Sequence, residues 1–236
     1  MAANENIWND SNERLVLYLD IMGFKERVSR TNIETLKEQL LAFKTQNIKL
    51  SPLLRTGNGD NKKELMKMAQ FSDSTVVVSA ENSKHDLNRI TRAAVILMQT
   101  ALKTGFALRG VIACGNMVFD EENQLFFGKA LVDAYNLEEQ LSFYGVVFHE
   151  SVERIVKQAL QAPNRTYFPI KDEAVYTKGG KSAHYHVAWY EMKEDLSKGS
   201  IKDQAIEWLT KLRESVSGIP RIYLDNTLKI IKCENI

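Results

Sequence analysis

Hydrophobic positions along the first half of the chain follow two kinds of spacing. Largely continuous apolar runs predict strands, and they stand at LVLYLDIMGF (15–24), MKMAQFSDSTVVVS (66–79) and FALRGVIACG (106–115). The second run is broken by a Ser-Asp-Ser triplet, which predicts a hairpin with an acid at its tip. Between the runs, apolar residues three and four positions apart predict helices after a capping pattern at Thr31 and over about 87–102.

The predicted order is therefore strand, helix, hairpin, helix and strand, with further helices at 129–141 and about 202–216. A βαββαβ order of this kind predicts an α+β fold of the ferredoxin-like type, with one antiparallel sheet packed on helices. We expect this core to occupy about residues 14–150, and additional strands and helices to fill about 151–236. No internal repeat or linker divides the chain, so a single domain over 1–236 is expected.

Two acidic residues interrupt the apolar runs. Asp20 follows five apolar or aromatic residues, and Asp73 stands at the tip of the predicted hairpin. An ionised carboxylate in such surroundings is costly unless it is paired or binds a cation. In the predicted sheet the first strand lies beside the hairpin, so the two carboxylates can meet at one edge and suit a hard divalent ion. The alternative is that Asp20 ends a strand and Asp73 is an ordinary turn residue.

Composition narrows the class of protein. The 31 basic and 30 acidic residues leave a net charge of +1, which argues against a nucleic-acid or anionic-membrane partner. No apolar run approaches the roughly 18–20 residues that span a bilayer, and the N-terminus lacks the order of a signal peptide. The two cysteines, Cys114 and Cys233, form no disulfide framework, so we expect a protein of the reducing cytoplasm.

Four stretches resemble the motifs of class III nucleotide cyclases, in that family's order and approximate spacing. LYLDIMGF (17–24) resembles the opening motif, an apolar strand that runs into Asp-Ile-x-Gly-Phe, and QFSDSTVVVS (70–79) resembles the second metal motif. LRGVIACG (108–115) is similar to the Arg-x-Gly-Ile-x-x-Gly strand, and FGKALVDAYNLEE (127–139) is similar to the Gly-led helix that follows it. Together these motifs span about half of the chain.

Within that family the chain looks most like the pyrimidine cyclases of bacterial Pycsar antiphage systems, a resemblance that extends to SGIPRIYLDNT (217–227). The resemblance implies an enzyme that converts UTP or CTP to cyclic UMP or CMP and pyrophosphate, with UTP favoured because most members of the subgroup use it. It implies two divalent metal ions, Mn²⁺ in preference to Mg²⁺. It also implies a homodimer with the substrate at its interface, and a separate effector that the cyclic nucleotide activates.

The resemblance also assigns roles to individual residues. Asp20, Asp73 and the backbone carbonyl of Ile21 would be the metal ligands. The turn at Gly23 and Phe24 would contact the nucleotide, because glycine lets the backbone come close to phosphates. These positions are therefore the first candidates for a nucleotide site.

The chain departs from the adenylate cyclase pattern at three positions. Ala69 stands where those enzymes carry an adenine-selecting lysine, which agrees with a pyrimidine substrate and places Ala69 in the expected base-binding region. Val132 and Asn136 stand where they carry the Asn and Arg that steady the transition state. Another cation must therefore offset the phosphate charge. The same departures keep two alternatives open, a module that binds nucleotide without turnover and a domain that only dimerises.

Three cations are candidates for the missing charge, namely Arg109, Lys129 and Lys67. Arg109 could equally form a structural ion pair, and Lys129 could be a solvated first-turn lysine rather than a phosphate ligand at a helix start. Trp8 is a candidate for stacking on the base, with anchoring of the N-terminus as the alternative. The stretch Lys178-Gly-Gly-Lys181 could bind phosphate, but it fits a hairpin turn better.

Overall fold

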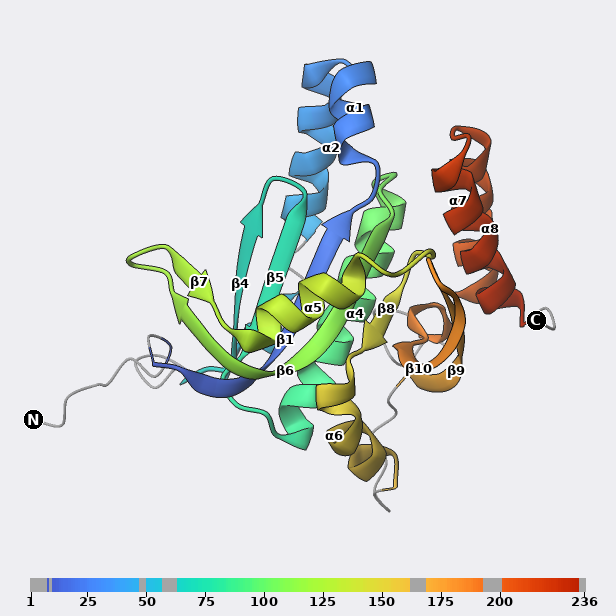
Figure 1. Ribbon diagram of the computed structural model, residues 1–236. Coiled ribbons are helices and arrows are strands. Elements are labelled where there is room, and N and C mark those ends of the chain that lie inside the picture. The colour runs from blue at the N-terminus through green and yellow to red at the C-terminus, as the bar shows by residue number, and fades with distance from the viewer. Residues whose placement is uncertain are drawn as a thin grey trace, which may run out of the picture.

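An eight-stranded sheet forms the centre of the molecule (Figure 1). The computed structural model describes Trp8 and residues 10–46, 50–56, 63–161, 169–192 and 201–233. The strands of the sheet are β1 (Asn12–Ile21), β4 (Met66–Phe71), β5 (Ser74–Ser79), β6 (Leu108–Asp120), β7 (Leu125–Phe127), β8 (Val146–Phe148), β9 (Ile170–Thr177) and β10 (Gly180–Val187). They run in the order β4-β5-β1-β6-β8-β10-β9, with β7 paired to β6. A separate two-stranded sheet joins β2 (Arg55–Thr56) and β3 (Lys63–Glu64).

The core strands pair as the βαββαβ order requires. β1 lies between β5 and β6 and is antiparallel to both, while β4 pairs with β5 to complete the hairpin. The spatial order β4-β5-β1-β6 is the ferredoxin-like arrangement. β8 joins the sheet parallel to β6, and β10 and β9 extend it further. The predicted α+β fold, with C-terminal strands and helices added to a ferredoxin-like core, is therefore confirmed.

Helices cover both faces of the sheet. α5 (Lys129–Glu138) crosses one face, and α4 (Lys84–Lys103) lies behind the other (Figure 1). The remaining helices are α1 (Phe24–Arg30), α2 (Ile33–Gln46), α3 (Ser51–Leu54), α6 (Glu150–Leu160), α7 (Lys202–Glu214) and α8 (Ile219–Lys232), with a short 3-10 helix, η3 (Trp189–Glu191). None of the helices in the described ranges combines the length and apolar character that crossing a bilayer requires.

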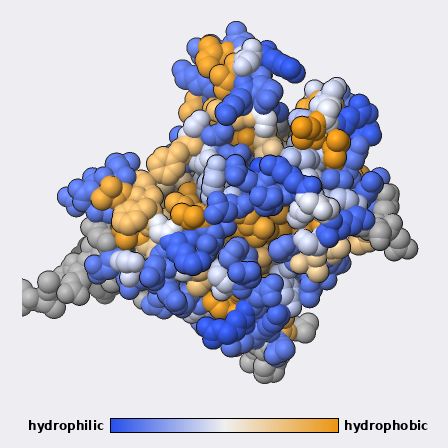
Figure 2. Space-filling model, in the orientation of Figure 1, coloured by the Kyte–Doolittle hydropathy of each residue, from blue (hydrophilic) through white to orange (hydrophobic). Residues whose placement is uncertain are grey.

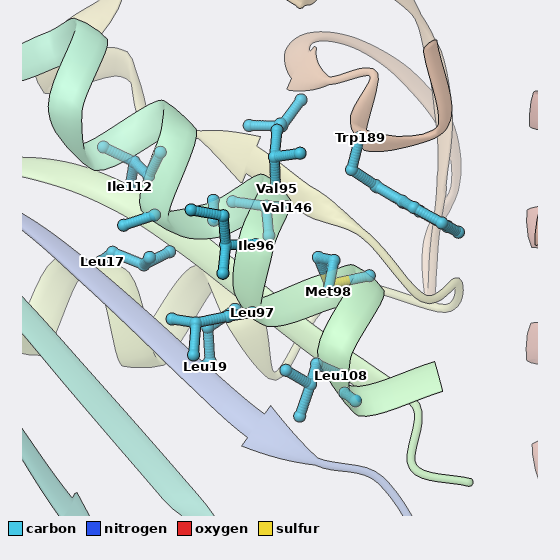
Figure 3. Close-up of a cluster of buried hydrophobic side chains, with 14 of the residues drawn as sticks. Leu17, Leu19, Val95, Ile96, Leu97, Met98, Leu108, Ile112, Val146 and Trp189 are labelled. Atoms are coloured by element: carbon cyan, nitrogen blue, oxygen red, sulfur yellow. The ribbon is translucent and has the colours of Figure 1, made fainter. Parts of the chain in front are cut away.

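The alternation of side chains along β1 divides the core into two layers. Leu17 and Leu19 belong to the larger apolar cluster, together with Leu97 of α4 (Figure 3). Tyr18 belongs to the second cluster, which lies on the α5 side of the sheet. Because successive side chains of a strand point to opposite faces, Asp20 shares the α5 side with Tyr18. The acid singled out by the sequence pattern therefore lies at the end of a buried strand and under α5.

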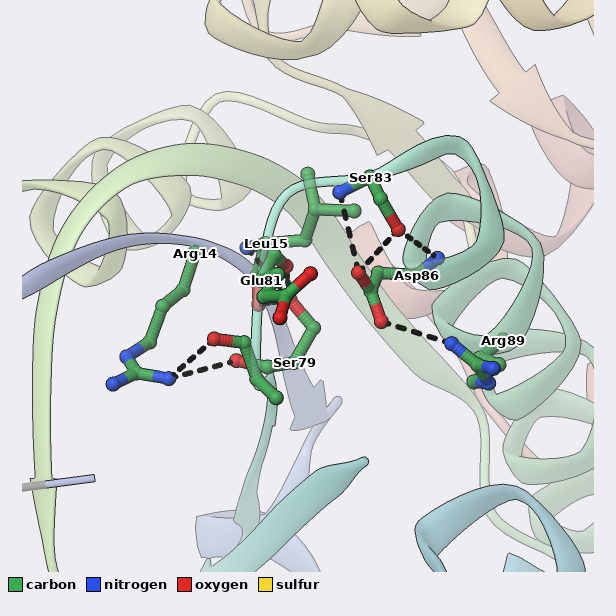
Figure 4. A network of polar contacts seen from close by, with 8 residues as sticks. Arg14, Leu15, Ser79, Glu81, Ser83, Asp86 and Arg89 are labelled. Atoms are coloured by element: carbon green, nitrogen blue, oxygen red, sulfur yellow. Dashed lines mark hydrogen bonds and ion pairs between the residues drawn. The ribbon is translucent and has the colours of Figure 1, made fainter. Parts of the chain in front are cut away.

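Side-chain hydrogen bonds fix the start of α4. The Ser83 hydroxyl accepts from the Asp86 amide, and the Asp86 carboxylate accepts from the Ser83 amide, both at 3.2 Å (Figure 4). Arg89 donates to the same carboxylate at 3.0 Å. Nearby, buried Arg14 of β1 donates to the Ala80 carbonyl at 2.7 Å. The Arg14 contact ties the end of β1 that lies away from Asp20 to the segment that precedes α4.

The capping pattern predicted at Thr31 is wrong. Asn32 caps α2 instead, because its Oδ1 accepts from the Glu34 amide at 2.8 Å. Thr31 closes the preceding helix, with its amide bonded to the Arg27 carbonyl at 2.8 Å. The predicted helix is present, but a short helix, α1, precedes it directly after the turn at Gly23.

Candidate active site

The end of β1 brings two acidic residues together. Asp20, the second-last residue of β1, pairs with Ser74 of β5. Asp73 lies in the turn between β4 and β5, and its carbonyl accepts a hydrogen bond from the Ile21 amide at 3.0 Å. In the same turn Ser72 adopts a φ of 49°, a left-handed conformation that keeps the hairpin tight. The proximity predicted from the strand order is present in the structure.

The electrostatic surroundings of Asp20 are unfavourable for its charge. Burial, followed by the nearby carboxylates of Glu138 and Asp73, raises the pKa of Asp20 to about 6. A hydrogen bond from Ser74 and the charge of Arg109 offset part of this effect. At neutral pH the carboxylate is therefore ionised but poorly compensated, and a divalent cation bound there would relieve the repulsion.

The donor set suits a divalent ion whose remaining ligands are water or phosphate oxygens. Within the described residues, no three or more His, Cys, Asp or Glu side chains converge as a complete set of ligands. Mg²⁺-like ions are commonly held by one or two carboxylates together with phosphate oxygens and water. Asp20 and Asp73 supply two hard oxygen donors at one sheet edge, so their chemistry fits that mode of binding.

Arg109 is held in a buried ion pair. Its guanidinium contacts the Glu138 carboxylate at the end of α5 and also donates to the Leu141 carbonyl at 2.7 Å. Arg109 is 7% exposed and Glu138 is 2% exposed. Both contacts use the guanidinium that a phosphate would need. The geometry thus matches the structural alternative for Arg109, which ties α5 to β6 next to Asp20.

The other two candidate cations are also engaged. Lys129, the first residue of α5, pairs with Asp133, and its side chain is 71% exposed. Glu138, which neighbours Asp20, lies nine residues further along the same helix, or roughly 14 Å at 1.5 Å per residue. Lys67 pairs with Glu121 at 2.7 Å. Within one chain, neither lysine lies beside Asp20 as a free charge.

Lys178 is the cation that sequence reasoning undervalued. It follows β9 in the turn of the β9–β10 hairpin, and its amide donates to the Gln140 carbonyl at 2.7 Å. Burial raises the pKa of Glu138, the carboxylate near Asp20, and the charge of Lys178 offsets a small part of that rise. The side chain is exposed and has no ion-pair partner among the described residues. The predicted hairpin turn is confirmed, and its backbone contact with Gln140 holds Lys178 next to the segment that follows α5.

Three of the four residues proposed to contact the nucleotide lie in a turn, a helix and a strand, respectively. Gly23 occupies the turn after β1 with a φ of 69°, a left-handed conformation that favours glycine. Phe24 begins α1 and packs on the larger core cluster. Ala69, on β4, packs against the second cluster on the α5 side of the sheet. Gly23 and Ala69 therefore border the end of the sheet that carries Asp20 and Asp73.

Trp8, the fourth of these residues, is buried, as expected if it anchors the chain rather than stacks on a base. The indole is 4% exposed and packs edge-to-face on Phe119, with ring centroids 6.4 Å apart. The Arg14 guanidinium lies 4.8 Å from the indole centroid. A ring enclosed in this way has no open face for a base to stack on.

An apolar strip lies exposed beside the site. Its residues come from the hairpin tip, β7 and the outer side of α5, and are between 44% and 57% exposed: Phe71, Leu125, Phe127, Val132 and Tyr135. Figure 2 shows apolar surface over the β6–β7 hairpin and the adjoining part of α5. Exposed apolar surface of this kind is typical of a contact with another protein.

Comparison with solved structures finds the same fold in nucleotide cyclases. A bacterial light-regulated adenylyl cyclase aligns over 86% of this chain and 99% of its own, with a TM-score of 0.51 and 12% identity. The catalytic core of a rhodopsin-guanylyl cyclase with converted specificity, in complex with ATPαS, aligns over 75% and 95%, with a TM-score of 0.49 and 14% identity. No family model and no curated protein matches the sequence. The chain has the fold of the class III nucleotide cyclases.

Proposed function

We propose that the chain is a metal-dependent nucleotide cyclase that converts UTP, or CTP, to the 3′,5′-cyclic monophosphate and pyrophosphate. The observation that carries this proposal is that Asp20 and Asp73 lie close together at the end of β1, where Asp20 pairs with Ser74 and the Ile21 amide donates to the Asp73 carbonyl, within a cyclase fold. The pyrimidine substrate rests on the motif resemblance and on Ala69, which offers a base no charged or polar side-chain group.

The chemistry needs a hydroxyl nucleophile, a stabilised phosphate and a leaving pyrophosphate. Two divalent ions, Mn²⁺ or Mg²⁺, would lower the pKa of the ribose 3′-hydroxyl and offset phosphate charge when bound. Asp20 and Asp73 would hold them with the Ile21 carbonyl. The turn at Gly23 would let the backbone approach the triphosphate, because no side chain intervenes.

Lys178 is the cation that we assign to the triphosphate tail in place of the missing Asn and Arg. It is exposed, it has no ion-pair partner in the described chain, and its charge already acts on Glu138 beside Asp20. Arg109 takes a positioning role, since its contacts with Glu138 and Leu141 hold the end of α5 against β6.

A second copy of the chain is the partner that we assign to the apolar strip. The resemblance implies a homodimer with substrate at its interface, and the strip adjoins Asp73 through Phe71. Val132→Glu should therefore convert a dimer to a monomer in sedimentation velocity. Val28→Glu, at a position of similar exposure on α1, is the matched control and should leave the dimer intact. The cyclic product would then act on a separate effector in antiviral defence.

A product assay tests the function. The purified protein is incubated with Mn²⁺ and each of the four nucleoside triphosphates, and cyclic products are identified by mass spectrometry. We expect cyclic UMP or CMP from the wild type, almost no product from Asp73→Asn, and normal turnover from Asp172→Asn on exposed β9. No cyclic product from any triphosphate would reject catalysis.

A nucleotide-binding module without turnover is the second candidate. It is favoured by Val132 and Asn136, which replace the transition-state Asn and Arg of adenylate cyclases. Calorimetry that shows nucleotide binding without product formation would support it. Absence of both nucleotide and metal binding would instead leave a domain that only dimerises.

A further inference from the structure

Two hydroxyl groups form a chain behind the Asp20 carboxylate. The Ser74 Oγ lies 3.2 Å from Asp20 Oδ1, and the Tyr18 Oη lies 3.0 Å from the same Ser74 Oγ. Tyr18 stands two residues before Asp20 on β1, so both side chains face the α5 side of the sheet. Ser74 pairs directly with Asp20 across the β1–β5 ladder. The three groups are thus held by the most regular part of the fold.

The chemistry of the groups sets the direction of these hydrogen bonds. An ionised carboxylate only accepts, so Ser74 donates its single hydroxyl hydrogen to Asp20. The Ser74 oxygen then accepts from Tyr18, which donates its phenolic hydrogen. Within the described residues Asp20 accepts no other side-chain hydrogen bond, so its second oxygen stays available to a ligand.

We propose that Ser74 and Tyr18 are positioning residues that orient Asp20 for metal binding, an inference that rests on the proposed function. Ser74 fixes one carboxylate oxygen and leaves the other without a side-chain hydrogen bond in the described parts of the chain. Tyr18 fixes the rotation of the Ser74 hydroxyl. The Tyr18 ring already packs edge-to-face on Tyr135 at 5.7 Å, so the core requires the ring, whereas the hydroxyl serves Ser74.

Outer partners of metal ligands commonly change metal affinity by about 10- to 100-fold when they are removed. Ser74→Ala should therefore weaken Mn²⁺ binding by about tenfold or more. Tyr18→Phe should weaken it by only about threefold, because Ser74 keeps its bond to Asp20 and loses one polarising donor. Ser74→Thr retains a hydroxyl and should restore most of the affinity.

The test measures Mn²⁺ binding to the purified chain by the electron paramagnetic resonance of the free ion, without nucleotide. The diagnostic variant is the double replacement, because Tyr18 acts through Ser74. In the Ser74→Ala background, Tyr18→Phe should cause no further loss. Tyr144→Phe is the matched control, since it removes a buried phenol that donates to the Pro220 carbonyl at 3.4 Å. Urea unfolding of each variant checks that the fold is retained.

The outcomes separate this proposal from the function on which it rests. If Asp20→Asn abolishes binding while Ser74→Ala binds Mn²⁺ as tightly as the wild type, the metal site stands and the positioning role is overturned. Additive losses in the double variant also overturn the hydroxyl chain. If the wild type itself binds no Mn²⁺, the metal site and the positioning role fail together.

Discussion

Asp20→Asn should stabilise the metal-free protein at alkaline pH. The pKa of Asp20 rises from an ordinary value of 3.8 to about 6 in the folded chain, chiefly through burial. Between these values the folded chain binds more protons than the unfolded chain, so stability falls as pH rises through this window. A shift of about 2 pH units corresponds to roughly 3 kcal/mol, which we reduce to about 1.5 kcal/mol because Asp20 is partly exposed and solvent screens it.

Urea unfolding followed by tryptophan fluorescence measures this effect, with EDTA present to remove metals. The free energy of unfolding of Asp20→Asn relative to wild type should be near zero at pH 4 and about 1.5 kcal/mol higher at pH 8. Mn²⁺ at 100 times its dissociation constant should then add about 2.7 kcal/mol to the wild type and nothing to the variant. A difference between the two proteins that stays constant with pH would refute the reasoning.

Three further predictions concern the Arg109–Glu138 ion pair, the buried His186 and the exposed Lys178. Glu138→Gln leaves Arg109 without its buried charged partner and should lower the free energy of unfolding in urea by about 3 kcal/mol. The double replacement Glu138→Leu, Arg109→Met should recover part of that loss. Equal losses in the two variants would contradict the ion-pair argument. His186 has its pKa lowered to about 4, first by burial and then by Lys171, so its folded pKa lies below its unfolded value and stability should fall as pH drops from 6.5 towards 4. His186→Phe should remove about 3 kcal/mol of that acid-dependent loss, and a pH profile identical to that of the wild type would reject it. Lys178→Ala should raise the KM for the triphosphate about tenfold with unchanged stability, and a KM equal to that of Lys181→Ala would remove Lys178 from the site.

The sequence alone was sufficient for the order of the core strands and for the proximity of Asp20 and Asp73. Apolar spacing located β1, the β4–β5 hairpin and α4, and the βαββαβ order left one plausible pairing of strands. Asp20 and Asp73 interrupt apolar runs at strand ends, so their convergence follows once those strands pair. Local signals sufficed here because the apolar spacing that predicts each of these elements lies within the element's own residues.

Helix α8 shows where local signals mislead. The helix predicted at about 202–216 is present as α7, which ends at Glu214, shortly before Gly218 and Pro220. The same proline also begins α8, since the first helical turn needs no amide hydrogen from it. Tyr223 and Leu224 of α8 are buried in the larger cluster. A proline at this position can either end one helix or begin the next. Packing of α8 against the core favours the second role for Pro220, and the spacing of residues along the chain does not reveal that packing.

The polar partners of the side chains around the site were decided by the tertiary structure. Glu138 reaches Arg109 across 29 residues of sequence, and Ser74 reaches Asp20 across 54. Arg109 and Trp8 carried open alternatives in the sequence, because a guanidinium or an indole serves a ligand or a core equally well. In the structure both side chains are buried, which matches the structural alternative for each. Residue type limits the chemistry that is possible, whereas long-range packing determines which polar groups are already paired, as Arg109 is with Glu138.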